Sequence, residues 1–145
     1  MANIADKLNP YLSDLVVFYL KLHDLHWNVK GMEFVPVHQY TESRYEDMAE
    51  KFDAVAELII MHGEQPVSCI ADYLKLANIK ELNKGLYRDQ EVLKIVLDDL
   101  TYLRSKAAEL RGAFDADGEF TAVAMMEDHV AGYDKEIWFL NSMMA

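Results

Sequence analysis

The chain has 145 residues, of which 52% are hydrophobic and 27% are charged, and its formal net charge is −11. These values predict one globular domain over residues 1–145, and they exclude a membrane span because no apolar run reaches the required length of about 18 residues. The acidic balance argues against a nucleic-acid-binding surface, and the lone Cys69 excludes an internal disulfide.

The start of the chain lacks the basic flank and apolar segment that are typical of a secretion signal. A single cysteine also suits a reducing compartment. We therefore expect a cytoplasmic protein with no membrane partner.

The first predicted helix covers residues 4–29. Asn9 and Pro10 are compatible with two alternatives, a helix cap with proline in the first turn or a mild kink, and Gly31 is a helix terminator. Apolar spacing predicts a stripe that faces the interior, formed by Leu12, Leu15, Tyr19, Leu22 and His26. His26 is therefore expected on the inner face at the end of this helix.

The second predicted helix covers residues 34–62 and should be roughly 42 Å long. It carries two pairs of metal-ligating residue types, each pair four residues apart and hence on one helix face: His38 with Glu42, and Asp53 with Glu57. The two pairs are roughly 22 Å apart along the helix axis. One metal centre within a single subunit cannot use both.

Two copies of this helix, packed antiparallel about a two-fold axis, would bring the first pair of one chain opposite the second pair of the other. His26 should join them from the preceding helix, and two equivalent sites would form per dimer. Imidazole and carboxylate ligands together suit iron, manganese or zinc.

The rest of the chain completes a four-helix pattern. The linker after Gly63 has roughly 25 residues, too many for a bare loop, and its segment IADYLKLA is typical of a short helix. A third helix is predicted over residues 88–111, ended by Gly112, and a fourth follows FDADG. Short connections within each helix pair and the long crossover between the second and third helices predict an all-α, ferritin-like four-helix bundle, without any strand.

The sequence resembles the Dps-like mini-ferritins in both residue types and separations, at His26 and Trp27 of LHWNVKG, His38, Glu42, Asp53 and Glu57. The resemblance covers nearly the whole chain. It implies a ferroxidase that oxidises ferrous iron, with hydrogen peroxide as the favoured oxidant, at di-iron sites between two subunits. It also implies that ferric mineral is stored in a hollow dodecamer of this chain.

The resemblance and the spacing together suggest how two irons would be divided. His26, Asp53 and Glu57 would hold one iron firmly, while His38 and Glu42 would hold a second iron more weakly. Ferritins with a di-iron site inside one bundle instead use Glu-x-x-His on two helices, a pattern that occurs nowhere in this chain.

Trp27 and Tyr45 are candidate electron donors near the irons, and core packing is the alternative role for both. Asp115, Asp117 and Glu119 are candidates for a cation-attracting pore at a three-fold axis. Their alternative role is to cap the fourth helix and to complement its dipole.

Two alternative functions stay open. The first is a nucleoid protein that protects DNA by binding it, as some Dps relatives do through lysine-rich tails. This chain has only Lys7 near its N-terminus and no lysine in its C-terminal MMA, so we do not expect DNA as a partner. The second is a metal-free helical scaffold, which metal analysis of the purified protein would distinguish.

Overall fold

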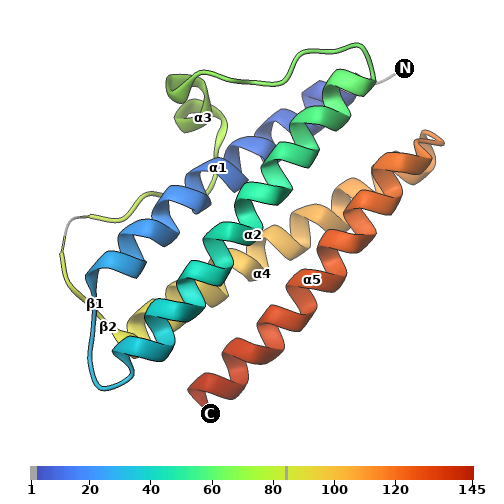
Figure 1. Cartoon of the computed structure of the whole chain (residues 1–145). Helices are drawn as coiled ribbons and strands as arrows, with labels where there is room; N and C mark the ends of the chain where they lie inside the picture. Colours follow the sequence, from blue (N-terminus) through green and yellow to red (C-terminus); the bar gives the residue numbers. More distant parts are fainter. Residues whose placement is uncertain (1–2, 84) are drawn as a thin grey trace.

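The computed structural model describes residues 3–83 and 85–145 (Figure 1). A short helix, α3, lies within the crossover between the second and third of the long helices. The helices are α1 (Ile4–Asn28), α2 (Phe34–Met61), α3 (Ile70–Leu76), α4 (Asp89–Ala116) and α5 (Phe120–Met144). The predicted all-α bundle with a helix in its crossover is confirmed.

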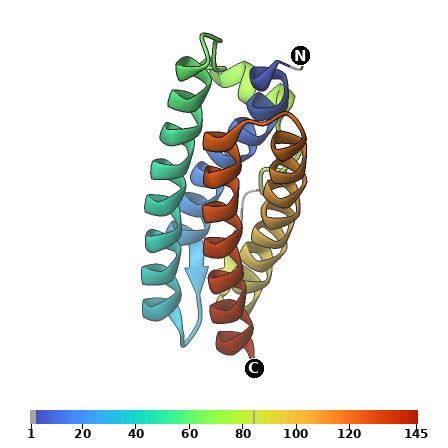
Figure 2. The same cartoon turned by 90° about the vertical axis from the view of Figure 1, so that its right-hand side faces the viewer.

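The long helices form two antiparallel hairpins that pack side by side. α1 packs mainly on α2, and α4 mainly on α5 (Figure 2). The crossover returns along the length of the bundle with α3 against α1, so that α2 and α4 run in the same direction (Figure 1). This is the topology that the connection lengths predict.

A small contact between the α1–α2 turn and the start of α4 was not predicted. β1 (Val29–Lys30) pairs in parallel with β2 (Tyr87–Arg88), so α1 ends one residue earlier than expected. Gly31 follows with a φ of 132°, and a Cβ there would lie 2.4 Å from Asp89 Oδ2. That same oxygen accepts a hydrogen bond of 2.9 Å from the Glu33 amide. Only glycine fits this turn without strain.

The predicted end of the third helix is wrong. Gly112 does not end the third helix, because α4 continues four residues further to Ala116, and a lone glycine costs a long, well-packed helix only about 1 kcal/mol. The first helix begins at Ile4 as predicted. Its cap is Asn3, whose side chain accepts a hydrogen bond of 2.9 Å from the Ala5 amide, so of the two alternatives for Asn9 and Pro10 the helix cap is wrong. Pro10 therefore lies within α1.

The core is apolar at most positions, but a buried carboxylate fastens the crossover to the bundle. Asp14 is 1% exposed, and its Oδ1 accepts hydrogen bonds from the amides of Asn78 (2.7 Å) and Ile79 (2.8 Å). Its Oδ2 accepts one from the Tyr102 hydroxyl of α4 at 3.0 Å. α1, α4 and the crossover thus share one polar anchor. Within the described ranges, no helix is long and apolar enough to cross a bilayer.

Candidate metal centre

His26 and His38 face each other where α1 ends and α2 begins. Their rings stack with centroids 3.6 Å apart and planes 15° from parallel. Each ring bonds to the backbone of the opposite helix: His26 Nδ1 lies 2.6 Å from the His38 carbonyl oxygen, and His38 Nδ1 lies 2.8 Å from the His26 carbonyl oxygen. A third contact joins Thr41 Oγ1 to His26 Nδ1 at 3.2 Å.

These contacts fix the tautomer of both rings. A carbonyl oxygen can only accept a hydrogen bond, so in the neutral form of each ring Nδ1 carries the proton and Nε2 presents a lone pair. Burial also lowers the pKa of His26, whose side chain is almost fully enclosed, so the imidazole is neutral at physiological pH. Neutral imidazoles with the second nitrogen held by a backbone acceptor are the usual form of a metal-ligating histidine pair.

Glu42 lies beside this pair. Its Oε1 is 4.0 Å from His26 Nε2, and it accepts a long hydrogen bond of 3.4 Å from the Tyr45 hydroxyl. Tyr45 in turn stacks on His23 at 3.7 Å between ring centroids. The spacing thus led to three residues that the structure brings together, His26, His38 and Glu42. The sequence analysis named Tyr45 near the site but missed Thr41, whose only signal is that it lies on the same turns of α2.

Asp53 and Glu57 lie four to five turns further along α2. Both are exposed, and neither side chain makes a hydrogen bond or ion pair with another described residue. Within residues 3–83 and 85–145, no three His, Cys, Asp or Glu side chains are arranged to hold a metal ion. A single chain therefore presents two incomplete half-sets of ligands.

Trp27 is next to His26 in the sequence but is not packed in the core. Its side chain is 63% exposed, and its ring centroid is 5.5 Å from that of His23. Packing in the core of one chain, the alternative role considered for Trp27, is therefore wrong. Its role as an electron donor stays a prediction.

The acids expected to gather at the start of the fourth helix are spread over the α4–α5 turn, and each has a basic partner. Asp115 is in the last turn of α4, 3.6 Å from Arg111, and Asp117 caps that helix, 3.1 Å from Lys7. Glu119 is the residue before α5 but makes no capping bond, and its Oε2 lies 2.8 Å from His62 Nε2. The prediction that these acids cap α5 is therefore wrong, and the three-fold pore stays a prediction.

Comparison with known proteins gives consistent matches over nearly the full chain. A family model described as a ferritin-like domain matches residues 5–145. A DNA protection during starvation protein of Helicobacter pylori is 34% identical over 133 residues, which cover 92% of each protein.

Two solved structures show the same fold. The crystal structure of Helicobacter cinaedi CAIP superposes with a TM-score of 0.94 at 39% identity, covering 98% of this chain and 99% of that one. A Dps protein of Vibrio cholerae, described as a member of a broad superfamily of ferritin-like diiron-carboxylate proteins, gives 0.93 at 28% identity, covering 98% and 89%.

Proposed function

The chain belongs to the Dps branch of the ferritin-like family, and from this premise we propose that it is a ferroxidase that stores iron. Its substrates are ferrous iron and hydrogen peroxide. The observation that carries the proposal is the reciprocal hydrogen bonding of His26 and His38, which holds two Nε2 lone pairs ready beside the Glu42 carboxylate.

The reaction site forms between two subunits. His26, His38 and Glu42 of one subunit meet Asp53 and Glu57 of a second subunit whose α2 runs antiparallel to the first. Support comes from the two half-sets on each chain, neither of which is a complete ligand set. The exposed side chains of Asp53 and Glu57 also support a site between subunits, since the ligands of such a site must be free in the isolated chain.

Each residue type has a separate role at this site. His26, Asp53 and Glu57 bind one ferrous ion, and their two negative charges favour the ferric product over the ferrous substrate. His38 and Glu42 bind a second ferrous ion less tightly. The two ions lose one electron each, and hydrogen peroxide takes both electrons with two protons to give two waters. Because the electrons leave as a pair, little hydroxyl radical is formed.

Storage requires a closed assembly, which we propose to be a dodecamer in the cytoplasm. Large apolar side chains that are exposed on the isolated chain support burial between subunits. They lie at both ends of the α1–α2 hairpin and at the start of α5, and include Trp27 (63% exposed), Met32 (99%), Ile60 (54%), Met61 (69%) and Phe120 (86%). The free and exposed Cys69 suits a reducing compartment.

Anaerobic titration with ferrous iron, followed by peroxide or oxygen, tests the activity. His26→Ala and Glu57→Ala should each lower the rate of rapid ferrous oxidation by about 100-fold, because each variant removes a ligand from every site. Glu50→Ala is the matched control, since Glu50 is another exposed acid on the same helix. Equal rates in all four proteins would contradict the proposal.

A further inference from the structure

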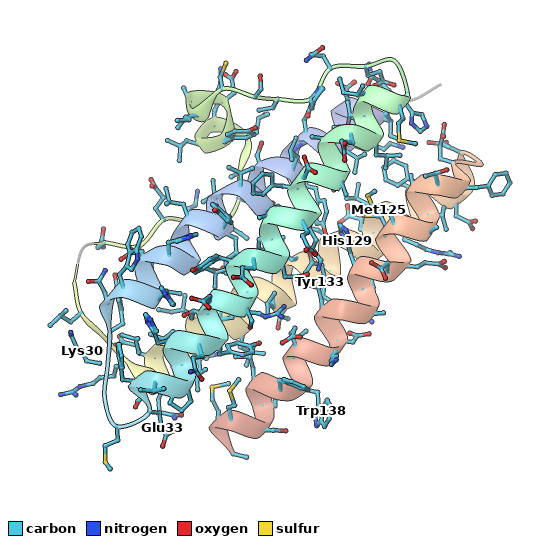
Figure 3. The ribbon with its side chains drawn as sticks, in the orientation of Figure 1. Lys30, Glu33, Met125, His129, Tyr133 and Trp138 are labelled. Carbon is cyan, nitrogen blue, oxygen red and sulfur yellow. The ribbon has the colours of Figure 1, made fainter. Side chains whose placement is uncertain are left out.

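Three side chains form a hydrogen-bonded chain inside the bundle, away from the candidate metal centre. The Tyr11 hydroxyl of α1 lies 2.6 Å from the Tyr133 hydroxyl and 2.8 Å from His129 Nδ1, both on α5. Figure 3 shows His129 and Tyr133 one turn apart on α5, and all three side chains are at most 3% exposed. Packing alone does not explain why three polar side chains are buried together.

The direction of the hydrogen bonds follows from the number of protons. If His129 donated to Tyr11, the Tyr11 proton would go to Tyr133, and the Tyr133 proton would have no acceptor among the described residues. In the opposite arrangement Tyr133 donates to Tyr11, and Tyr11 donates to His129 Nδ1. Every hydroxyl proton is then bound. The Tyr11 proton therefore points at a nitrogen base.

Burial keeps all three groups neutral. It raises the pKa of Tyr11 and Tyr133 well above the usual value for a phenol and lowers the pKa of His129 to about 4. Neither phenol thus ionises by pH alone. An oxidised phenol, in contrast, is a very strong acid, so its proton would pass even to a weakly basic imidazole.

The two tyrosines are not equivalent. Lys51 Nζ lies 5.4 Å from the centroid of the Tyr133 ring, and a cation beside a ring makes removal of an electron from it harder. Tyr11 has no such cation over its ring among the described residues. It has a proton acceptor on one side and a hydrogen-bond donor on the other, both of which stabilise a phenoxyl radical.

Tyr11 also borders a cavity. A cavity of about 290 Å³ lies between α1, α4 and the crossover, and it is lined by Tyr11, Asp14, Tyr102 and Lys106 among others. Tyr11 itself is only 2% exposed. Tyr11 thus forms part of the cavity wall while nearly all of its own surface is buried.

From this geometry we propose that Tyr11 is a one-electron redox site that consumes radical oxidants, with His129 as the acceptor of its proton. The oxidant is the hydroxyl radical released when a single ferrous ion reduces hydrogen peroxide, so its source rests on the proposed ferroxidase function. The site would act on radicals that escape the paired reaction.

The electrons and protons balance in two steps. Tyr11 gives one electron to the hydroxyl radical, which becomes hydroxide, and gives its proton to His129, so that a neutral phenoxyl radical and an imidazolium remain. A ferrous ion then returns one electron, His129 returns the proton, and a ferric ion is left. Neither residue is consumed, and each cycle destroys one radical.

Electron paramagnetic resonance on freeze-quenched samples tests this proposal. The assembled protein is loaded anaerobically with ferrous iron and mixed with hydrogen peroxide. A parallel sample contains ring-deuterated tyrosine, which identifies a signal that comes from tyrosine. We expect a tyrosyl signal that is lost in Tyr11→Phe and weakened in His129→Leu. The matched control is Tyr102→Phe, because Tyr102 lines the same cavity but donates to the Asp14 carboxylate. That control should keep the signal.

Tyr11→Phe alone leaves the buried Tyr133 hydroxyl without its partner, which could disturb folding. The double variant Tyr11→Phe, Tyr133→Phe removes both hydroxyls and so avoids this defect. Circular dichroism checks that each variant is folded. A tyrosyl signal that persists in the folded double variant, or that disappears only with Tyr102→Phe or Trp27→Phe, would overturn the assignment.

Ferrous oxidation is recorded optically on the same samples, so that the two proposals fail separately. If the wild-type protein does not oxidise iron, a photogenerated ruthenium(III) oxidant replaces iron and peroxide. A radical on Tyr11 under light would then support the redox site without the ferroxidase, and its absence would refute the redox site as well.

Discussion

His26 and His38 differ from the other three histidines in what their Nδ1 atoms contact. His23 and His62 bond to carbonyl oxygens one turn back in their own helix, and His129 bonds to a tyrosine hydroxyl. Among the described residues, only His26 and His38 use Nδ1 to bond to the backbone of another helix, each to the carbonyl of the other. That contact fixes the direction of both Nε2 lone pairs when the chain folds, before any iron binds, and so reduces the entropy lost on binding.

The sequence identified the residue types of the candidate site but not this contact. The separation of His38 and Glu42 on one helix follows from helical periodicity alone. The reciprocal bonding depends on how tightly the α1–α2 turn brings the two helices together, which no local pattern encodes. The buried hydrogen bonds of His129 were missed for the same reason, because its partner Tyr11 is 118 residues away.

Buried His129 should make stability depend on pH. Its pKa is lowered to about 4, against about 6.5 in an unfolded chain, so between these values the unfolded chain binds more protons and stability falls as pH falls. The loss should reach about 3 kcal/mol by pH 4. Denaturant unfolding at several pH values measures this loss of unfolding free energy. His129→Leu should remove the part of the pH dependence of stability that His129 causes.

His62 provides a control of opposite sign. Its hydrogen bond with Glu119 raises its pKa, so the stability it contributes is present at low pH and is lost as pH rises through the raised pKa. His62→Gln should therefore leave the acid-side loss attributed to His129 in place. A wild-type slope that survives in His129→Leu would show that other groups cause it.

At the scale of helices, length and order were predictable because apolar residues recur at helical spacing over long stretches. α2 begins at Phe34 and ends one residue before the predicted end, and α3 lies within the segment expected to be helical. The two-residue strands were not predictable, since each is too short for any periodicity and forms only when the crossover returns to the α1–α2 turn. The end of α4 was misplaced because glycine often, but not always, terminates a helix.

Two glycine substitutions should therefore have opposite effects. Gly31→Ala places a Cβ 2.4 Å from Asp89 Oδ2 at a φ of 132° and should destabilise the fold by about 1–3 kcal/mol. Gly112→Ala meets nothing within 4 Å inside α4 and should stabilise it by about 0.5–1 kcal/mol. Thermal melting of both variants checks the pair, and a destabilised Gly112→Ala would mean that this position does not behave as helix interior.

At the scale of the whole molecule, the negative charge favours the binding of iron cations and opposes the binding of DNA. The net charge of −11 attracts cations and repels phosphate, and Lys7 is engaged with Asp117 at 3.1 Å. Relatives carry the name DNA protection during starvation protein. The proposed ferroxidase function predicts protection by removal of ferrous iron and peroxide and not by contact with DNA.

We therefore expect no retardation of DNA in a gel-shift experiment at physiological salt without divalent metal. Polyanion binding needs several lysine or arginine contacts to phosphate, and the sequence has 14 lysine and arginine residues against 25 aspartate and glutamate residues. A positively charged Dps protein would serve as the comparison. Clear retardation that weakens as salt is raised would contradict the expectation.

The shared site is tested most directly by complementation between two inactive subunits. One carries His26→Ala and His38→Ala, and the other carries Asp53→Ala and Glu57→Ala. In a heterodimer one site loses its ligands from both subunits, while the other keeps a full set. Refolding the two together should restore about half of the wild-type ferrous oxidation per heterodimer, or about a quarter in a random equimolar mixture. A mixture in which heterodimers are shown to form, yet which stays as inactive as its parents, would contradict a site built between subunits.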